Sequence, residues 1–293
     1  MKTSWALFLI LMSTNIHAQM TIDSILSVYG DDNRQEVARA SRSHQKLADS
    51  TAALIVNSFM VKEGSSHRID APTLEQQDGV CATERYRDQP AASVCSGTLI
   101  APDLMLTAAH CYTSAATCTH ASWVFGFHES RNGKYKIKNK EIYKCKEVVY
   151  RAFSIKDGKD FAIVKLDRKV KGHSPVELRQ EGSAEVNTKL VLIGHPRGLP
   201  TKIADDAWIT SIKDGSILMS NLDAYTGNSG SGVFNAEAGF LEGVLSFGNE
   251  DYLENEQASC FSSQVYRMQD GGEAIMKIDP VRDFLKTYQT TRP

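Results

Sequence analysis

The stretch CSGTLIAPDLMLTAAHC, residues 95–111, joins a β-like run to a histidine that is followed directly by a cysteine. The apolar and β-branched residues of this run predict a strand. A disulfide between Cys95 and Cys111 would hold the backbone of His110 against that strand. A histidine in a fixed position can accept and return a proton near neutral pH. We therefore treat His110 as a candidate general base.

A carboxylate that could orient this histidine lies further along the chain. Asp160 stands directly before the apolar run FAIVKL, so its side chain would lie at the entrance of a buried strand. From there it could accept the Nδ1 proton of His110 and hold one tautomer. Asp157, in a turn, and Asp167, after the strand, are weaker alternatives for the same role.

A candidate nucleophile lies in the stretch YTGNSGSGVF, residues 225–234. A serine needs a base to become nucleophilic, and the oxyanion that forms needs preorganised donors. Gly227 lets the backbone turn so that its own N–H group and that of Ser229 point to one place. Ser231 stands where the G-x-S-x-G motif of α/β-hydrolases has its second glycine, so that motif is absent. The chain order of histidine, aspartate and serine also differs from the hydrolase order, which argues against an esterase of that class.

The three stretches together resemble the active-site blocks of chymotrypsin-like (trypsin-like) serine proteases, most closely the bacterial branch that includes glutamyl endopeptidases. Further matches are LIGHPRGLPTK and LSFG, and the resemblance covers roughly residues 51–290. It implies an all-β fold of two six-stranded antiparallel β-barrels with a C-terminal helix and a cleft between the barrels. It also implies His110 as general base, Asp160 as its orienting acid and Ser229 as nucleophile, with the N–H groups of Gly227 and Ser229 as the oxyanion hole.

The resemblance further implies a specificity pocket, formed by the residue six positions before the nucleophile and by the strand after it. These positions are Asp223 and the run Ser246, Phe247 and Gly248. A carboxylate at the pocket floor would favour Lys or Arg before the scissile bond. The alternative for Asp223 is a structural role in a turn. The segment VLSFG contains no histidine, which argues against specificity for glutamate.

Asn228 departs from the pattern of animal trypsins. Those enzymes carry an aspartate directly before the nucleophile, and it receives the new N-terminal ammonium on activation. The amide of Asn228 has no charge with which to receive it. We therefore expect this chain to lack the trypsin-type activation switch.

The remaining sequence predicts a β-rich protein. Short apolar runs, separated by Gly, Pro, Asn and Asp, recur from Thr51 onward and indicate a barrel or a sandwich. Two helices are expected, one over residues 35–50 and one over residues 279–289. The second places Val281, Phe284 and Leu285 on one apolar face.

The N-terminus has the form of a secretory signal peptide. A positively charged start, an apolar core shorter than a membrane span and a small-residue site predict cleavage after Ala18. We expect residues 1–18 to be this signal and residues 19–50 to be an N-terminal lead-in or a pro-segment. Residues 51–293 would form the protease domain, whose two halves meet near residues 170–185. The protein would be secreted or periplasmic.

An even number of cysteines in an exported chain predicts disulfides. The sequence contains no C-x-x-C pair, which is the spacing that would suggest a zinc site. We expect Cys95 to pair with Cys111. The other four cysteines allow three pairings, and we prefer Cys118–Cys145 with Cys81–Cys260.

Charge and composition limit the partners. The formal net charge of −2 gives no overall attraction to nucleic acid or to anionic membranes. The lysine-rich region 131–172 interleaves lysines with acids and strand residues, which is typical of a solvated strand face. We expect polypeptide substrates, a monomer, and no metal or organic cofactor.

These observations favour an exported serine endopeptidase that acts through an acyl-enzyme intermediate. The alternative is a non-catalytic, protease-like secreted binding protein. Such proteins typically lose a member of the triad, and this chain retains all three residues.

Overall fold

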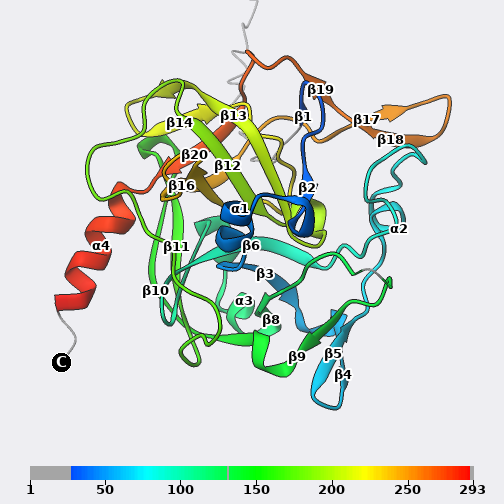
Figure 1. Cartoon of the computed structure of the whole chain (residues 1–293), viewed down its shortest axis with the longest axis horizontal. Helices are drawn as coiled ribbons and strands as arrows, with labels where there is room; N and C mark the ends of the chain where they lie inside the picture. Colours follow the sequence, from blue (N-terminus) through cyan, green and yellow to red (C-terminus); the bar gives the residue numbers. More distant parts are fainter. Residues whose placement is uncertain (1–27, 131, 291–293) are drawn as a thin grey trace, which may run out of the picture.

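Six antiparallel strands close the first barrel, which lies in the lower half of Figure 1. The computed structural model describes residues 28–130 and 132–290. The barrel strands, in chain order, are β3 (Thr51–Val56), β6 (Ser93–Ala101), β7 (Leu104–Thr107), β8 (Ala121–Phe125), β10 (Ile142–Ser154) and β11 (Lys159–Leu166).

Six further antiparallel strands close the second barrel, in the upper half of the same view. Strand β13 pairs with both β14 and β12, and that second pairing closes the ring. The strands are β12 (Lys189–Gly194), β13 (Lys202–Lys213), β14 (Ile217–Ser220), β15 (Gly232–Asn235), β16 (Leu241–Phe247) and β20 (Glu273–Lys277). The expected fold of two six-stranded barrels is therefore confirmed.

Strand β11 shows why a nearly continuous apolar run suits this fold. Successive side chains of a strand point to opposite faces. Phe161 and Ile163 pack into the apolar cluster that also contains residues of the second barrel and of the C-terminal helix. Val164 and Leu166 pack into the interior of the first barrel, around Trp123. Both faces of this strand are buried, which fixes the position of its first residues.

The two expected helices differ in how closely they match the structure. Helix α4 (Asp279–Thr290) packs Val281 and Leu285 into the core, with Phe284 partly buried beside them. The helix expected over residues 35–50 is much shorter. It is α1 (Arg42–Ala48), which begins after Ser41, whose side chain caps the N–H group of His44. The residues before it form a 3₁₀ turn and strand β2 (Gln35–Glu36), which pairs with β13.

Smaller elements surround the barrels. A three-stranded sheet contains β4 (Met60–Glu63), β5 (Ser66–Ile69) and β9 (Lys136–Lys138), and a hairpin contains β17 (Tyr252–Asn255) and β18 (Cys260–Ser263). Strand β1 (Val28–Tyr29) runs parallel to β19 (Val265–Tyr266). The short helices are α2 (Leu74–Asp78), α3 (Ala115–His120), η1 (Val37–Arg39), η2 (Asn57–Phe59), η3 (Ala109–Tyr112), η4 (Asn139–Glu141), η5 (Ile155–Asp157) and η6 (Pro196–Gly198).

All six cysteines are paired. The disulfides are Cys95–Cys111, Cys118–Cys145 and Cys81–Cys260, so the preferred pairing is confirmed. Such bridges are typical of proteins that leave the reducing cytosol. The expected signal peptide lies outside the described residues.

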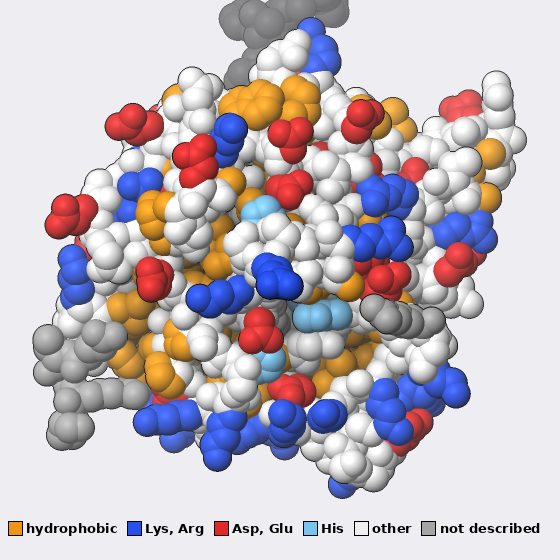
Figure 2. Space-filling view, viewed as in Figure 1, with side chains coloured by type: hydrophobic (Ala, Val, Ile, Leu, Met, Phe, Trp, Pro, Cys, Tyr) orange, Lys and Arg blue, Asp and Glu red, His pale blue; other side chains and the backbone are white. Residues whose placement is uncertain are grey.

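The lysine-rich region is a solvent-facing rim. Figure 2 shows Lys and Arg side chains gathered along the lower edge of the molecule. Lys136 and Lys138 of β9 are exposed while Ile137 between them is buried, as in a strand with one solvated face. Lys136 pairs with Glu63, and Lys140 pairs with Glu141. None of the helices among residues 28–130 and 132–290 is long and apolar enough to cross a membrane.

Candidate active site

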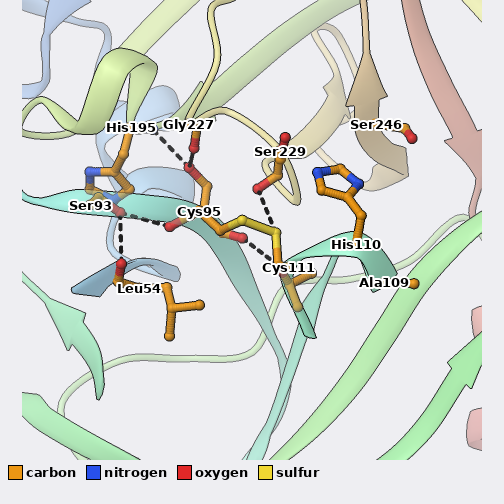
Figure 3. Close-up of a disulfide and its surroundings, with 12 residues drawn as sticks. Leu54, Ser93, Cys95, Ala109, His110, Cys111, His195, Gly227, Ser229 and Ser246 are labelled. Atoms are coloured by element: carbon orange, nitrogen blue, oxygen red, sulfur yellow. Dashed lines mark hydrogen bonds between the residues drawn. A yellow bond between two sulfur atoms is a disulfide. The ribbon is translucent and has the colours of Figure 1, made fainter. Parts of the chain in front are cut away.

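The first barrel places His110 at the end of β7, in the short helix η3. The Cys95–Cys111 disulfide joins this turn to β6, as Figure 3 shows. The backbone N–H group of His110 donates to Oδ1 of Asp160 at 3.0 Å. Backbone and disulfide together therefore hold the imidazole in place, with 30% of the side chain exposed.

Asp160 receives three hydrogen bonds at the start of β11. Its Oδ2 lies 2.6 Å from Nδ1 of His110 and also accepts the hydroxyl proton of Ser246, from the second barrel. Burial acts to raise the pKa of this carboxyl, but the hydrogen bonds from His110 and Ser246 and the charge of His110 outweigh it, so the pKa is lowered overall. Asp160 is thus an ionised partner for the histidine.

The two alternative aspartates contact other groups. Asp157 accepts the hydroxyl proton of Ser154, and Asp167 accepts the N–H group of Lys144 and pairs with Arg168. Both are exposed. Neither of these two carboxylates forms a hydrogen bond or an ion pair with His110.

Ser229 lies in a loop whose shape depends on two glycines. Gly227 and Gly230 have φ angles of +94° and +86°, a region that side chains disfavour. A Cβ atom on Gly230 would also overlap Oγ1 of Thr107 and the carbonyl oxygen of Ser96. The loop therefore packs directly on the first barrel next to the turn that carries His110.

The Cys95–Cys111 disulfide lies close to both Ser229 and His110. The carbonyl oxygen of Ser229 accepts the N–H group of Ser96 at 2.9 Å and lies 3.8 Å from Sγ of Cys111. One ring nitrogen of His110 lies within 4.8 Å of that sulfur, and Figure 3 shows the ring beside Ser229. The structure thus brings the three predicted residues to one place between the barrels.

The backbone N–H groups of Gly227 and Ser229 make no hydrogen bond within the described part of the chain. The hydroxyl of Ser96 donates to the carbonyl oxygen of Gly227 at 2.9 Å, which sets the orientation of that residue. The same hydroxyl accepts the N–H group of His195. The two N–H groups are therefore available to an oxyanion. The loop that carries them is held by the hydrogen bond from Ser96 to the carbonyl oxygen of Gly227.

A charged network also supports the loop that carries Ser229. The guanidinium of Arg197 pairs with Asp78 and with Asp251, at 2.7 and 2.8 Å. Asp251 also accepts the N–H group of Thr226, next to Gly227. This network ties the loop to helix α2 and to the segment before β17.

Asn228 is a buried residue of this loop. Its side-chain oxygen accepts the hydroxyl proton of Ser231, and its backbone N–H group donates to Tyr225. Among the described residues, no charged group pairs with it.

One group of potential metal ligands lies in the described part of the chain, made by Cys95, His110 and Cys111. Both sulfurs belong to the disulfide, so neither can act as a thiolate ligand. The cluster does not fit a metal site.

The profile of the trypsin-like peptidase domain matches residues 95–244, which is 150 of the 293 residues. The chain belongs to this family. The resemblance to chymotrypsin-like proteases is thereby confirmed. No curated protein matches the chain.

Solved structures of the family's fold cover most of the chain. A Glu endopeptidase in complex with MPD is 18% identical over 90% of this chain and 100% of its own, with a TM-score of 0.53. A protein named HBP is 12% identical over 87% and 96%, with a TM-score of 0.55. An inactive-form mutant of Rv3671c from M. tuberculosis H37Rv is 13% identical over 92% and 99%, with a TM-score of 0.50. At these identities the likeness shows the shared fold.

In this trypsin-like peptidase the four predicted pocket residues lie in different environments. Asp223 is buried, and its two oxygens accept the N–H groups of Tyr29 and Asn33 at 2.7 and 2.8 Å. Burial raises its pKa to about 7, against the effect of these hydrogen bonds. Ser246 donates to Asp160. Phe247 is half-buried beside Met219 and Ala274, and Gly248 lies against Glu273.

Three contributors to this region were not predicted from the sequence, and a fourth, Ser246, was predicted only as a pocket residue. Ser96 orients the loop that carries Ser229, the hydroxyl of Ser246 reaches Asp160, and Tyr29 and Glu273 lie beside the end of β16. Ser246 and Asp160 are 86 residues apart in sequence. Such pairs follow from barrel closure, and no local motif marks them.

Proposed function

We propose that this trypsin-like peptidase is an exported serine endopeptidase, with His110, Asp160 and Ser229 as its catalytic triad. The observation that carries the proposal is the contact of 2.6 Å between Nδ1 of His110 and Oδ2 of an ionised, buried Asp160. In this contact Nδ1 of His110 carries a proton and donates it to a hydrogen bond with Asp160. Nε2 is then unprotonated and can act as the base.

The reaction proceeds in two halves. His110 takes the proton of the Ser229 hydroxyl as Oγ attacks the carbonyl carbon of the scissile peptide bond. The imidazolium then gives this proton to the leaving amine, and the acyl-enzyme remains. In the second half, His110 takes a proton from water as the water attacks the ester carbon. The bond between that carbon and Oγ then breaks, the product leaves as a carboxylic acid, and His110 returns the proton to Ser229.

The tetrahedral intermediates carry a negative oxygen. The unpaired N–H groups of Gly227 and Ser229 donate to it. Donors fixed in advance stabilise such a charge better than water, which must reorient. The hydrogen bond from Ser96 to Gly227 and the contacts of Asp251 with Thr226 and Arg197 support this preorganisation.

Export and assembly belong to the same proposal. We assign residues 1–18 to a signal peptide cleaved after Ala18, and the three disulfides support an oxidising compartment such as the periplasm or the exterior. The protein acts as a monomer on polypeptides.

Labelling with a fluorophosphonate probe tests the proposal. Folded wild-type protein should be labelled, Ser229→Ala should not, and His110→Ala should react about 10³-fold more slowly because it lacks the base. Ser231→Ala is the matched control, since it removes the neighbouring serine and should keep the label. Folded wild-type protein that takes no label would contradict the proposal and favour a binding protein.

A further inference from the structure

Six carboxylates are buried in the described part of the chain, and four of them have a basic partner. Glu36 pairs with Lys202, Asp160 with His110, Glu242 with Arg179 and Asp251 with Arg197. The other two, Asp223 and Glu273, have no Lys, Arg or His within ion-pair distance among the described residues. A buried carboxylate without a cation or a full set of hydrogen bonds is costly and calls for an explanation.

Asp223 is accounted for by the backbone. Both of its oxygens accept N–H groups, from Tyr29 and Asn33. Its carboxylate therefore anchors the N-terminal segment of the described chain. A substrate cation would have to compete with both of these hydrogen bonds.

Glu273 is different because only one of its oxygens is satisfied. Oε1 accepts the hydroxyl proton of Tyr29 at 3.2 Å and lies 3.4 Å from the N–H group of Asn249. The Tyr29 hydroxyl in turn accepts the backbone N–H group of Gly272 and the side-chain amide of Asn249, so its single proton points to Glu273. Oε2 has no partner among the described residues, although the side chain is fully buried.

The position of Glu273 relates it to the candidate active site. It is the first residue of β20, which pairs with the pocket strand β16. A Cβ atom on Gly248 would overlap both of its carboxylate oxygens, so the carboxylate lies directly against that glycine. Two residues earlier, Ser246 contacts Asp160. Two residues of strand span about 7 Å, a distance that the stem of a Lys or Arg side chain can bridge.

We propose that Glu273 selects the substrate of this enzyme, and that the cation it lacks is the Lys or Arg side chain before the scissile bond. The inference rests on the proposed function, because it places a substrate side chain beside Ser229. It replaces Asp223 as the candidate selector. A long basic side chain that reaches Gly248 would bring its charge to Oε2, which lies directly against that glycine.

The chemistry of the free protein agrees with this role. Burial raises the pKa of Glu273 well above its ordinary value, and the negative charges of Asp251 and Asp223 raise it further. Burial therefore favours the neutral form of the free carboxyl. An entering guanidinium or ammonium would favour the ionised form and form a charge-assisted hydrogen bond in a dry site.

The test compares peptides that differ only in the residue before the scissile bond, which is Arg, Lys, Gln or Leu. For each protein, kcat/KM is divided by the fraction of Ser229 that takes the fluorophosphonate label. Wild-type protein should prefer Arg and Lys. Glu273→Gln should lower kcat/KM for these two peptides by about 100-fold or more, as expected for the loss of a buried charge pair, and should leave the Gln and Leu peptides within about threefold.

Asp223→Asn is the matched control, because it neutralises the other unpaired carboxylate. It should keep the preference for Arg and Lys. A preference that survives Glu273→Gln, or that disappears only in Asp223→Asn, would overturn the inference. Wild-type protein that takes the label but does not favour Arg and Lys would also overturn it, and would leave the proposed function standing.

A binding measurement separates the inference from catalysis and from misfolding. Ser229→Ala protein should bind benzamidine, a small aromatic amidinium, and the double variant with Glu273→Gln should bind it at least about 30-fold more weakly. Glu273→Ser provides a second neutral replacement, with its own melting temperature as a check of folding. Equal benzamidine affinity in folded proteins with and without the carboxylate would refute the role of Glu273.

Discussion

At the scale of single residues, Ser246 joins the two barrels at the centre of the candidate site. It belongs to β16 of the second barrel, and it donates to Asp160 at the start of β11 in the first. The same oxygen of Asp160 contacts Nδ1 of His110. We therefore expect Ser246 to be a positioning residue, because it contacts the aspartate that contacts the histidine.

Replacing Ser246 by alanine should slow the enzyme without unfolding it. A hydrogen bond to a charged group is worth about 1.5–3 kcal/mol, so kcat/KM should fall about 10- to 100-fold. The fluorophosphonate rate should fall with it, because the base is less well oriented.

The matched control for this variant is Ser220→Ala. Ser220 is a buried serine of β14 whose hydroxyl donates to the carbonyl oxygen of Glu273. The Ser220→Ala variant should change the rate of fluorophosphonate labelling by less than about threefold. Equal rates for wild-type protein and Ser246→Ala would show that the contact with Asp160 has no role in catalysis.

At the scale of elements, the N-terminal segment pairs with strands from the second half of the chain. Strand β1 pairs with β19, and β2 pairs with β13. Between them the guanidinium of Arg34 lies 4.1 Å from the ring centre of Tyr225, two residues before Gly227. The backbone of this segment also satisfies Asp223. These contacts are those of a structural component and argue against removal of the whole lead-in during maturation.

Truncation tests this role. A chain that begins at Arg42 should lose about 3–6 kcal/mol of stability, because the N–H groups of Tyr29 and Asn33 no longer satisfy the buried Asp223. Its fluorophosphonate labelling should also slow. Thermal unfolding of a chain that begins at Val28 is the reference, and identical midpoints for both chains would count against the proposed role.

The elements also differ in how readily they could be predicted. Runs such as KLVLIG and FAIVKL carry enough apolar, β-branched residues to predict β12 and β11. Strand β20 is short and follows two glycines, and the run SQVYRM before it, residues 263–268, forms only the two-residue β19. Strand β20 owes its structure to pairing with β14 and β16. Glu273 could not be found from the sequence because the strand that carries it was missed.

At the scale of the whole molecule, the Cys81–Cys260 disulfide connects distant parts of the chain. Cys81 follows helix α2, before the first barrel is complete, and Cys260 opens β18, after most of the second barrel. A bridge between Val80 and Phe261 accompanies it. The loop it closes spans 179 residues, against 27 for Cys118–Cys145.

Removal of these two disulfides should have unequal effects. Replacing both cysteines of a bridge by serine should cost roughly 2–5 kcal/mol, and the chain-entropy relation gives about 1–2 kcal/mol more for Cys81–Cys260 than for Cys118–Cys145. Denaturant unfolding of the two double variants measures this difference. A larger loss for the shorter loop would show that local packing outweighs chain entropy here.

The sequence by itself determined the resemblance to the family, and through it the two-barrel fold and the three candidate catalytic residues. It could do so because the resemblance depends on short local patterns, a histidine, an aspartate and a serine in characteristic surroundings, while the apolar runs alone predicted a barrel or a sandwich. The expected pairing of the six cysteines also agrees with the structure.

Only the tertiary structure decided which groups surround that triad. Ser246 meets Asp160, Tyr29 meets Glu273 and the N-terminal backbone meets Asp223 across 86, 244 and up to 194 residues of sequence. Contacts at such separations depend on barrel closure and on strand register, which short patterns do not encode. For the same reason, whether a buried carboxylate has a cationic partner depends on residues that are distant from it in sequence.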